Sequence, residues 1–284
     1  DFCLSRGLGD VYKRQVRIRK MSDNPTNGGE LVRIGSSMRA LAQFQRNVDR
    51  GMARAAAEEN VLNQLTNTLT RGIELGIGQA SATGNAQSRL IVKAEVDQLI
   101  NFAANLGNTR LGDEYLFGGH RAGEAPFQTP PPATGSFSRL LVAGNPVDPS
   151  GTITLEVGDN DFVTPTHNGT EVFLDTDALE SLRALSTALG NNDPLAIQAA
   201  ADRITTANNS VQSLIGTQGA RINELETANA NLLAVELNLK TFRADLRDTE
   251  VDKAMVELVG KQTLYQAAMS ATSRILGLSL ANYL

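Results

Sequence analysis

Tryptophan is absent from this chain of 284 residues, and cysteine, histidine and aromatic residues are scarce. The single cysteine, Cys3, excludes an internal disulfide framework and any zinc site built from several cysteines. Aromatic residues make up 5% of the chain, too few for a core built around large rings. No apolar run approaches the roughly 18 to 20 residues that span a bilayer, so the sequence predicts no membrane insertion.

Signs of catalysis or of nucleic-acid binding are equally few. The net charge of −5 argues against a nucleic-acid partner, because phosphate contacts need a basic surface. No P-loop, dinucleotide fingerprint, HExxH, CxxC or GxSxG motif occurs. His120 lies near Asp113 and Glu114, but its Gly-Gly-His-Arg setting favours an exposed loop histidine over a metal or acid–base cluster. The sequence therefore predicts no enzyme, no cofactor and no metal site.

Residues 1–15, DFCLSRGLGDVYKRQ, differ in character from the rest of the chain. They show neither a helical stripe nor strand alternation, and they lack the apolar core of a signal peptide. We interpret them as a non-native artefact resembling translated adapter sequence, with a short disordered native tail as the alternative. A native start near Val16 would mean that upstream sequence is missing.

Apolar residues at helical spacing dominate what the chain does contain. Between Glu30 and Gln79 there is no proline, and the apolar spacings alternate between three and four residues, as in a coiled-coil seam. Fifty residues of helix would extend roughly 75 Å. We expect Gly72, Gly76 and Gly78 to loosen the end of this helix. The seam consists of Ile34, Met38, Leu41, Val48, Met52, Ala55, Leu62, Leu69 and Ile73.

Further stripes predict four more helical segments. Val92–Leu106 indicates a helix that returns antiparallel to the first, and a helix from about Thr176 ends at the break Asn191–Pro194. A long stripe follows up to Leu246, with Asn208, Gln218 and Asn229 at seam positions where polar residues can fix register. A last stripe begins after Arg247-Asp248.

The stretch between residues 111 and 180 is rich in glycine and proline and holds eleven acidic residues against two arginines. Short β-like pieces appear at Ser138–Val142, Thr152–Val157 and Glu171–Leu174, and Asn168-Gly169 is a tight-turn signal before the last piece. We read Asp159-Asn160-Asp161 as a turn, not as the start of a calcium loop. This stretch is therefore predicted to be a small β-rich insertion.

These observations predict a mainly α fold, a long antiparallel helical bundle or coiled-coil rod with a small β-rich inserted domain. The predicted parts are 16–117 and 176–247 as the two helical halves of one bundle, 118–175 as the inserted domain, and 248–284 as a C-terminal assembly helix.

Three stretches carry more specific motifs. The first, RIRKMSDNP, is a turn sequence, the second accompanies the change from helix to the insertion, and the third closes the chain. The residues concerned are Arg17, Ile18, Ser22, Asp23, Asn24 and Pro25; Asn108–Arg110, Tyr115–Gly119 and Pro126-Phe127; and Gln262–Ala268 with Leu278–Leu284. Together they resemble the flagellar hook-associated protein 3 family, the hook–filament junction proteins related to flagellin, over residues 16–284.

Two departures from the family pattern affect the first stretch. Met21 stands where the family's RI-x-x-P-S-D-D-P turn has proline, which leaves the turn less rigid. The family's first terminal helix, upstream of this turn, is absent from the chain.

The resemblance implies a non-enzymatic structural protein of the bacterial flagellum, with a flagellin-like fold. Its implied partners are other copies of itself in an adaptor ring, the hook-side junction protein (hook-associated protein 1), flagellin on the filament side and an export chaperone. It also implies export of the unfolded chain by the flagellar type III apparatus and assembly outside the cell. The absence of cysteine after residue 15 suits that route, because such a chain has no thiols to misoxidise.

The last stripe is the predicted assembly interface. Because the upstream helix that would cover it is absent, we expect five residues of this stripe to be poorly buried in the isolated chain: Met255, Leu258, Met269, Leu276 and Leu280. We further expect the chain as given to be soluble but unable to assemble, and to regain assembly when a native N-terminal helix is restored. The interface residues are Val251, Met255, Leu258, Tyr265, Met269, Leu276 and Leu280.

Other functions remain open at this point. A flagellin filament subunit would polymerise by itself into long filaments, whereas a junction protein would form a bounded assembly with two different partners. A coiled-coil adhesin or phage fibre would form a stable trimer in isolation. An enzyme is the least favoured class, since the motif search found no catalytic group.

Overall fold

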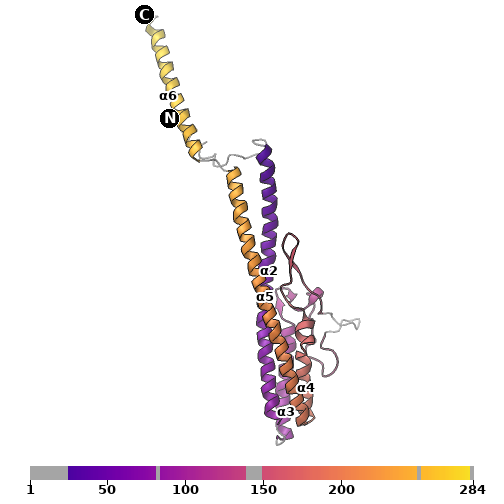
Figure 1. Cartoon of the computed structure of the whole chain (residues 1–284). Helices are drawn as coiled ribbons and strands as arrows, with labels where there is room; N and C mark the ends of the chain where they lie inside the picture. Colours follow the sequence, from indigo (N-terminus) through magenta and orange to yellow (C-terminus); the bar gives the residue numbers. More distant parts are fainter. Residues whose placement is uncertain (1–24, 81–83, 139–148, 248–250, 282–284) are drawn as a thin grey trace. The chain divides into compact units, whose positions relative to one another are not determined.

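The structure, a computed structural model, describes residues 25–80, 84–138, 149–247 and 251–281 (Figure 1). Arg17, Ile18, Ser22, Asp23 and Asn24 of the turn motif lie outside these residues, and Pro25 begins the first described helix. The helices are α2 (Pro25–Gln79), α3 (Ala86–Gly107), η2 (Gly119–Arg121), η3 (Thr170–Asp175), α4 (Ala178–Gly190), α5 (Pro194–Arg247) and α6 (Val251–Ala281); the strands are β1 (Arg110–Leu111), β2 (Glu114–Tyr115), β3 (Leu155–Gly158) and β4 (Asp161–Val163).

Long helices make up most of the described chain, and the predicted mainly α, flagellin-like fold class is confirmed. The contacts divide the chain into two compact units, one of residues 41–233 and one of residues 1–40 with 234–284. The sequence predicted other boundaries, after residues 117, 175 and 247, and these boundaries stay a prediction.

Within residues 41–233, α2 and α5 pack antiparallel: residues nearer the N-terminus of α2 contact residues nearer the C-terminus of α5. A side chain added at Gly51 would meet Leu225, and one added at Gly72 would come within 3.5 Å of Ile204. The side-chain amide of Gln218 donates to the carbonyl of Ala55, at an N–O distance of 3.4 Å.

The shorter helices α3 and α4 also run antiparallel to the helices next to them. An ion pair of 2.8 Å joins Arg71 of α2 to Glu95 of α3, and Arg89 of α3 donates to the carbonyl of Gln79 near the connecting turn. Ser186 of α4 donates to the carboxylate of Asp97 in α3. The predicted return of α3 antiparallel to α2 is therefore confirmed.

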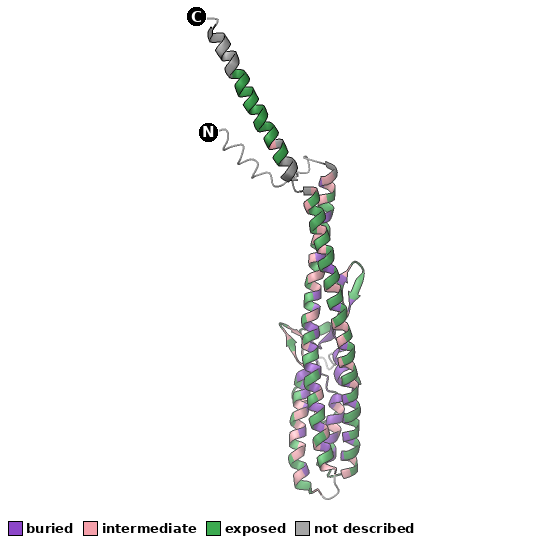
Figure 2. Cartoon of the chain, turned by 60° about the vertical axis from the view of Figure 1, so that its left-hand side comes forward, coloured by how far each residue is buried: buried purple, intermediate pink, exposed green. Residues whose placement is uncertain are grey.

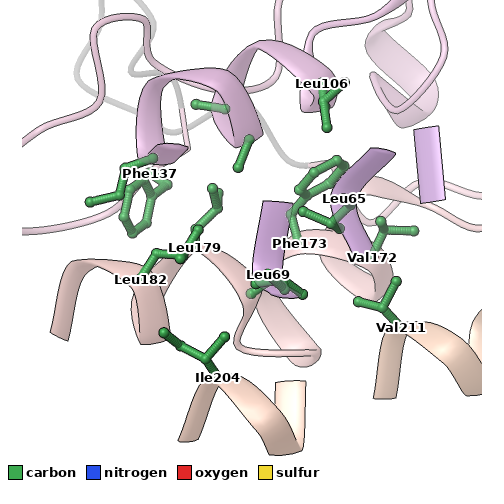
Figure 3. Close-up of a cluster of buried hydrophobic side chains, with 14 of the residues drawn as sticks. Leu65, Leu69, Leu106, Phe137, Val172, Phe173, Leu179, Leu182, Ile204 and Val211 are labelled. Atoms are coloured by element: carbon green, nitrogen blue, oxygen red, sulfur yellow. The ribbon is translucent and has the colours of Figure 1, made fainter. Parts of the chain in front are cut away.

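The main core of this unit collects the predicted apolar stripes of all four helices (Figure 3). Leu65 and Leu69 of α2 meet Leu182 of α4 and Ile204 of α5, and all four side chains are fully buried. Figure 2 shows the buried residues on the facing sides of the helices and the exposed ones outside. Apolar spacing alone thus identified the packed face of each helix.

Aromatic residues of the insertion join this core instead of forming a core of their own. The ring centroids of Phe117 and Phe173 lie 5.2 Å apart in an edge-to-face arrangement, and those of Phe127 and Phe173 lie 5.1 Å apart. All three rings are buried within the helical cluster. Phe137 is buried there too, under the guanidinium of Arg183.

A second apolar cluster forms where the β3–β4 hairpin lies on the two long helices. Val157 and Val163 of the hairpin pack with Val48 of α2 and with Leu225 and Leu232 of α5. The strands are antiparallel, with Leu155 opposite Val163, and Asn160 turns the chain with a φ of 57°. The turn reading of residues 159–161 is confirmed, and the strand predicted at Thr152–Val157 begins later, at Leu155.

The strand predicted at Glu171–Leu174 is wrong, because these residues form the π-helix η3. Asn168 and Glu171 cap its first turn reciprocally: the Asn168 side chain accepts from the Glu171 amide at 2.9 Å, and the Glu171 carboxylate accepts from the Asn168 amide at 3.2 Å. Asn168-Gly169 therefore starts a helix and does not form a hairpin turn. The strand predicted at Ser138–Val142 lies mostly outside the described residues.

Capping also fixes the start of α5 at the predicted break. Pro194 occupies the first helical position, where its missing N–H costs nothing. The carboxylate of Asp193 accepts from the backbone amides of Leu195 and Ala196, at 3.0 and 3.1 Å.

The glycines near the end of α2 do not loosen the helix as predicted, since α2 continues to Gln79. A Cβ at Gly76 would lie 3.0 Å from the Cβ of Ala201, and one at Gly72 would lie 2.7 Å from Cδ2 of Leu182. These glycines let α2 approach α4 and α5 closely, whereas Gly78 faces open space.

Gly107, the last residue of α3, makes the closest approach to an aromatic ring. A Cβ there would lie 2.5 Å from Cδ2 of Phe127, so we expect Gly107→Ala to displace this ring and to lower the free energy of unfolding by about 1–3 kcal/mol. The control is Gly216→Ala in α5, where the Cβ meets nothing within 4 Å and helix propensity predicts a gain of up to about 1 kcal/mol. Urea unfolding of both variants measures the difference. Equal effects of the two substitutions would contradict the packing argument.

The other unit contains the N-terminal part of α2, the C-terminal part of α5, and α6. Ile34 is the buried apolar residue of its α2 segment. Nη1 of Arg243 lies 3.9 Å from the sulfur of Met38, and Lys240 forms an ion pair of 2.7 Å with Glu236.

Candidate assembly surface

Helix α6 carries the residues that the sequence predicts as an assembly interface. Met255, Tyr265 and Met269 are 59%, 58% and 57% exposed, and Leu258 is half-buried. The side chains of Val251, Leu276 and Leu280 lie outside the described residues. The expected poor burial is thus observed for Met255 and Met269, while a role of the stripe in assembly stays a prediction.

The exposed apolar surface of α6 extends beyond this stripe. Val256, Val259 and Leu264 are also exposed, at 74%, 59% and 71%. Val256 and Leu264 lie at other angles around the helix, whereas Val259 lies one turn after Met255 on nearly the same face. From Gln262 to Ser273 the sequence contains no charged residue. The stripe analysis missed Val256 and Leu264 because it kept only one face, and it left out Val259 although this residue lies beside the stripe.

A helix that is apolar on several faces is typical of a buried position. When such an apolar surface is exposed to water, it marks a site at which a partner binds. The described side chains of α6 offer a partner apolar area and few charges, and they form no catalytic arrangement.

The residues that could suggest chemistry elsewhere take part in structural contacts. His120 is exposed in η2, as predicted for a loop histidine. Glu114 accepts from Arg50 at 2.7 Å and from the buried Arg54 at 3.1 Å, so it does not face His120 as a ligand pair. Among the described residues, no group of three or more potential metal ligands occurs.

An open groove of about 610 Å³ lies between α4, α5 and the loop around Gly135. Six of its 13 lining residues are alanines. The arginines at its rim are paired within the chain, Arg183 with Glu180 and Arg203 with Asp177. The groove therefore offers no unpaired charge to a ligand.

A buried polar cluster joins α2, the segment before η3, and α5. Glu58 is fully buried and accepts from the backbone N–H of His167 with both oxygens at 3.1 Å, while His167 Nδ1 lies 2.7 Å from Glu58 Oε1. Burial is the main influence on the Glu58 carboxyl and raises its pKa, against the opposing effects of His167 and Arg221. Burial likewise lowers the pKa of Arg54.

The sequence analysis did not identify this cluster. Glu58 stands three residues after Ala55 and four before Leu62, so Glu58 itself occupies a position in the apolar seam. A charged residue at a seam position was the sign in the sequence of a buried polar contact. Nothing local marks His167, because its partner is 109 residues away in the sequence.

No helix among the described residues combines the length and the hydropathy that crossing a membrane requires.

Comparison with known proteins gives consistent relatives. The family described as bacterial flagellin C-terminal helical region matches residues 201–284. Flagellar hook-associated protein 3 of Escherichia coli K12 is 23% identical over 292 residues, which cover 96% of this chain and 90% of that protein. The flagellar filament 30.7 kDa core protein of Treponema maltophilum is 23% identical over 260 residues, covering 89% of this chain and 82% of that protein.

A solved structure described as a flagellar hook-associated protein from Vibrio parahaemolyticus has a similar fold. It superimposes with a TM-score of 0.67 and 18% sequence identity, and the match covers 80% of this chain and all of that one. These comparisons confirm the resemblance that the sequence motifs indicate. The chain is a flagellin-like structural protein of the bacterial flagellum, related over nearly its whole length to flagellar hook-associated protein 3.

Proposed function

We propose that the protein is the adaptor between hook and filament, and that copies of it form a ring at this junction. Its neighbours are the hook-side junction protein and flagellin, and it reaches them outside the cell after export by the flagellar type III apparatus with an export chaperone. Similarity to hook-associated protein 3 over nearly the whole chain supports this role. The role is structural and involves no catalysis.

The observation that carries the proposal is the exposed apolar surface of α6. Met255, Tyr265 and Met269 expose more than half of their surface on one side, and Val256 and Leu264 do so elsewhere on the helix. Burying one such side chain contributes about 1.5–3 kcal/mol. A helix with apolar residues on several faces gains most when neighbouring subunits surround it, as in a closed assembly.

A filament subunit is the second candidate. The Treponema filament core protein is as similar to this chain, at 23% identity, as hook-associated protein 3 is. Sequence similarity does not distinguish the two kinds of protein, so the position of the protein in the flagellum is the deciding measurement.

Immunogold electron microscopy with antibodies against residues 41–233, in the bacterium that carries the gene, distinguishes the two functions. We expect label in one narrow band at the hook–filament boundary. We also expect deletion of the gene to leave hooks without filaments while flagellin appears in the medium. Deletion with a second, full-length copy of the gene restored in trans is the control.

Label along whole filaments, or self-polymerisation of the purified protein into long filaments, would instead establish the filament subunit. A stable trimer in isolation, with normal flagella after deletion, would indicate a coiled-coil fibre and would exclude both flagellar roles.

A further inference from the structure

Two of the five methionines lie on α6, within its exposed apolar surface. Met255 and Met269 are 59% and 57% exposed, so small molecules dissolved in water reach both side chains. They are about four helical turns apart and therefore lie on nearly the same face of the helix. A thioether in this position is open to chemical modification.

The other described methionines are shielded in two ways. Met52 of α2 packs against the apolar cluster that joins the β3–β4 hairpin to the long helices. The sulfur of Met38 lies 3.9 Å from Nη1 of Arg243, and this guanidinium donates to the sulfur. Its positive charge also opposes the partial positive charge that a sulfur atom acquires when it reacts as a nucleophile. Met21 lies outside the described residues.

Peroxides oxidise the thioether of methionine to a sulfoxide. The sulfur lone pair attacks one oxygen of hydrogen peroxide, so that an S–O bond forms and the O–O bond breaks. The proton of the transferred hydroxyl passes to the departing hydroxide, and the products are the sulfoxide and water. Sulfur loses two electrons and the peroxide gains two. The reaction therefore requires an accessible sulfur and a peroxide, and no further group of the protein.

We propose that Met255 and Met269 form a peroxide-modified site, at which oxidation to sulfoxides before assembly keeps a subunit out of the flagellum. Burial of the same side chains in the assembly protects subunits that are already incorporated. The site itself follows from the exposure of the two side chains. Its effect on assembly rests on the proposed function.

The sulfoxide opposes assembly because it turns a flexible apolar side chain into a polar one with a strong acceptor oxygen. A contact that covers α6 would bury this oxygen. From Gln262 to Ser273 the helix has no charged residue, so its own side chains offer no cation to the new dipole. A buried acceptor without a partner weakens binding by about 5- to 100-fold, and this factor applies to each sulfoxide.

The first test compares oxidation rates within one molecule. The full chain, with Cys3 blocked by alkylation, is treated with dilute hydrogen peroxide at pH 7, and trypsin then releases each compared methionine on its own peptide. Mass spectrometry is expected to show Met255 and Met269 oxidised at least about fivefold faster than Met38 and Met52. The same treatment in concentrated urea is the control, in which all these rates are expected to converge.

The site is overturned if Met255 or Met269 of the folded chain reacts no faster than Met52, or if Met38 reacts as fast as they do. This measurement needs no substitution and does not depend on flagellar assembly.

The second test measures protection in the assembled state. Intact flagella of the bacterium that carries the gene, and subunits dissociated from them, receive the same peroxide treatment. Met255 and Met269 are expected to react at least about fivefold more slowly in the intact flagella. Equal rates would mean that both sulfurs stay exposed after assembly, and the proposed control of assembly would fail.

The third test measures binding of the dissociated subunits to hooks isolated from the deletion strain. Oxidised subunits are expected to bind about 5- to 100-fold more weakly than untreated ones. Treatment with the reductases MsrA and MsrB, which reduce the two sulfoxide epimers, is expected to restore binding. Equal binding of oxidised and untreated subunits, or a loss that the reductases do not reverse, would overturn the control of assembly.

These tests separate the inference from the proposed function. If untreated subunits did not bind hooks, the junction function would be contradicted, and its control by oxidation with it. The oxidation site would then still be decided by the rates of the first test.

Discussion

Replacing both Met255 and Met269 by aspartate is expected to abolish incorporation of the protein into flagella. Both side chains are more than half exposed on α6, and two buried carboxylates in an intersubunit contact would each carry a large desolvation penalty. The lost apolar burial adds about 1.5–3 kcal/mol for each methionine. Electron microscopy of flagella from a strain that carries only the variant gene measures incorporation.

The same substitutions are expected to leave the folded chain intact, because exposed positions usually change the free energy of unfolding by less than about 0.5 kcal/mol. Met255→Leu with Met269→Leu keeps the apolar surface and is expected to assemble. Leu195→Asp, at an 84% exposed residue of α5, controls for an added charge elsewhere. Normal filaments from the double aspartate variant would remove α6 from the assembly surface.

Phe173→Ala is expected to lower the free energy of unfolding by about 3–5 kcal/mol. The Phe173 ring is fully buried and packs against both Phe117 and Phe127, with centroids 5.2 and 5.1 Å away. Removing it leaves a cavity between η3 and the helices and ends two aromatic contacts. Urea unfolding followed by circular dichroism measures the loss.

Phe162→Ala is the matched control, since this ring on β4 is 60% exposed. Its removal is expected to change stability by less than about 0.5 kcal/mol. If Phe173→Ala were as mild as Phe162→Ala, the insertion would not share the core of the helices, contrary to the contacts described above.

Apolar periodicity was enough to predict the helices and their packed faces. Val48, Leu62 and Leu69 were assigned to the seam of the first helix, and each is fully buried. This succeeds because the helices are long and a seam repeated over many turns leaves one consistent face. Gln218, predicted as a polar seam residue, is also fully buried and donates to two backbone carbonyls.

The insertion was harder to predict because its structure depends on partners distant in sequence. Val172 and Phe173 have high β propensity, yet the Asn168–Glu171 cap and burial against the helices make this segment a π-helix. The capping pattern of asparagine followed three residues later by glutamate was present in the sequence and could have indicated the helix.

The candidate assembly surface was predicted in part. The stripe residues Met255 and Met269 are exposed as expected, but a one-face pattern could not identify Val256 and Leu264. Helix α6 carries apolar residues on several faces, whereas a seam pattern describes only the face that contacts one neighbouring helix.

The antiparallel packing of α2 and α5 also determines how much of the chain must be present before this unit can fold. Ala55 meets Gln218 across a separation of 163 residues, and Glu58 meets His167 across 109. Contacts of such long range form slowly, because a large loop must close before any apolar area is buried. The apolar face of α2 therefore stays unburied until the residues of α5 are available to cover it. A chain exported unfolded, as proposed above, would bury this face only after α5 had also emerged outside the cell.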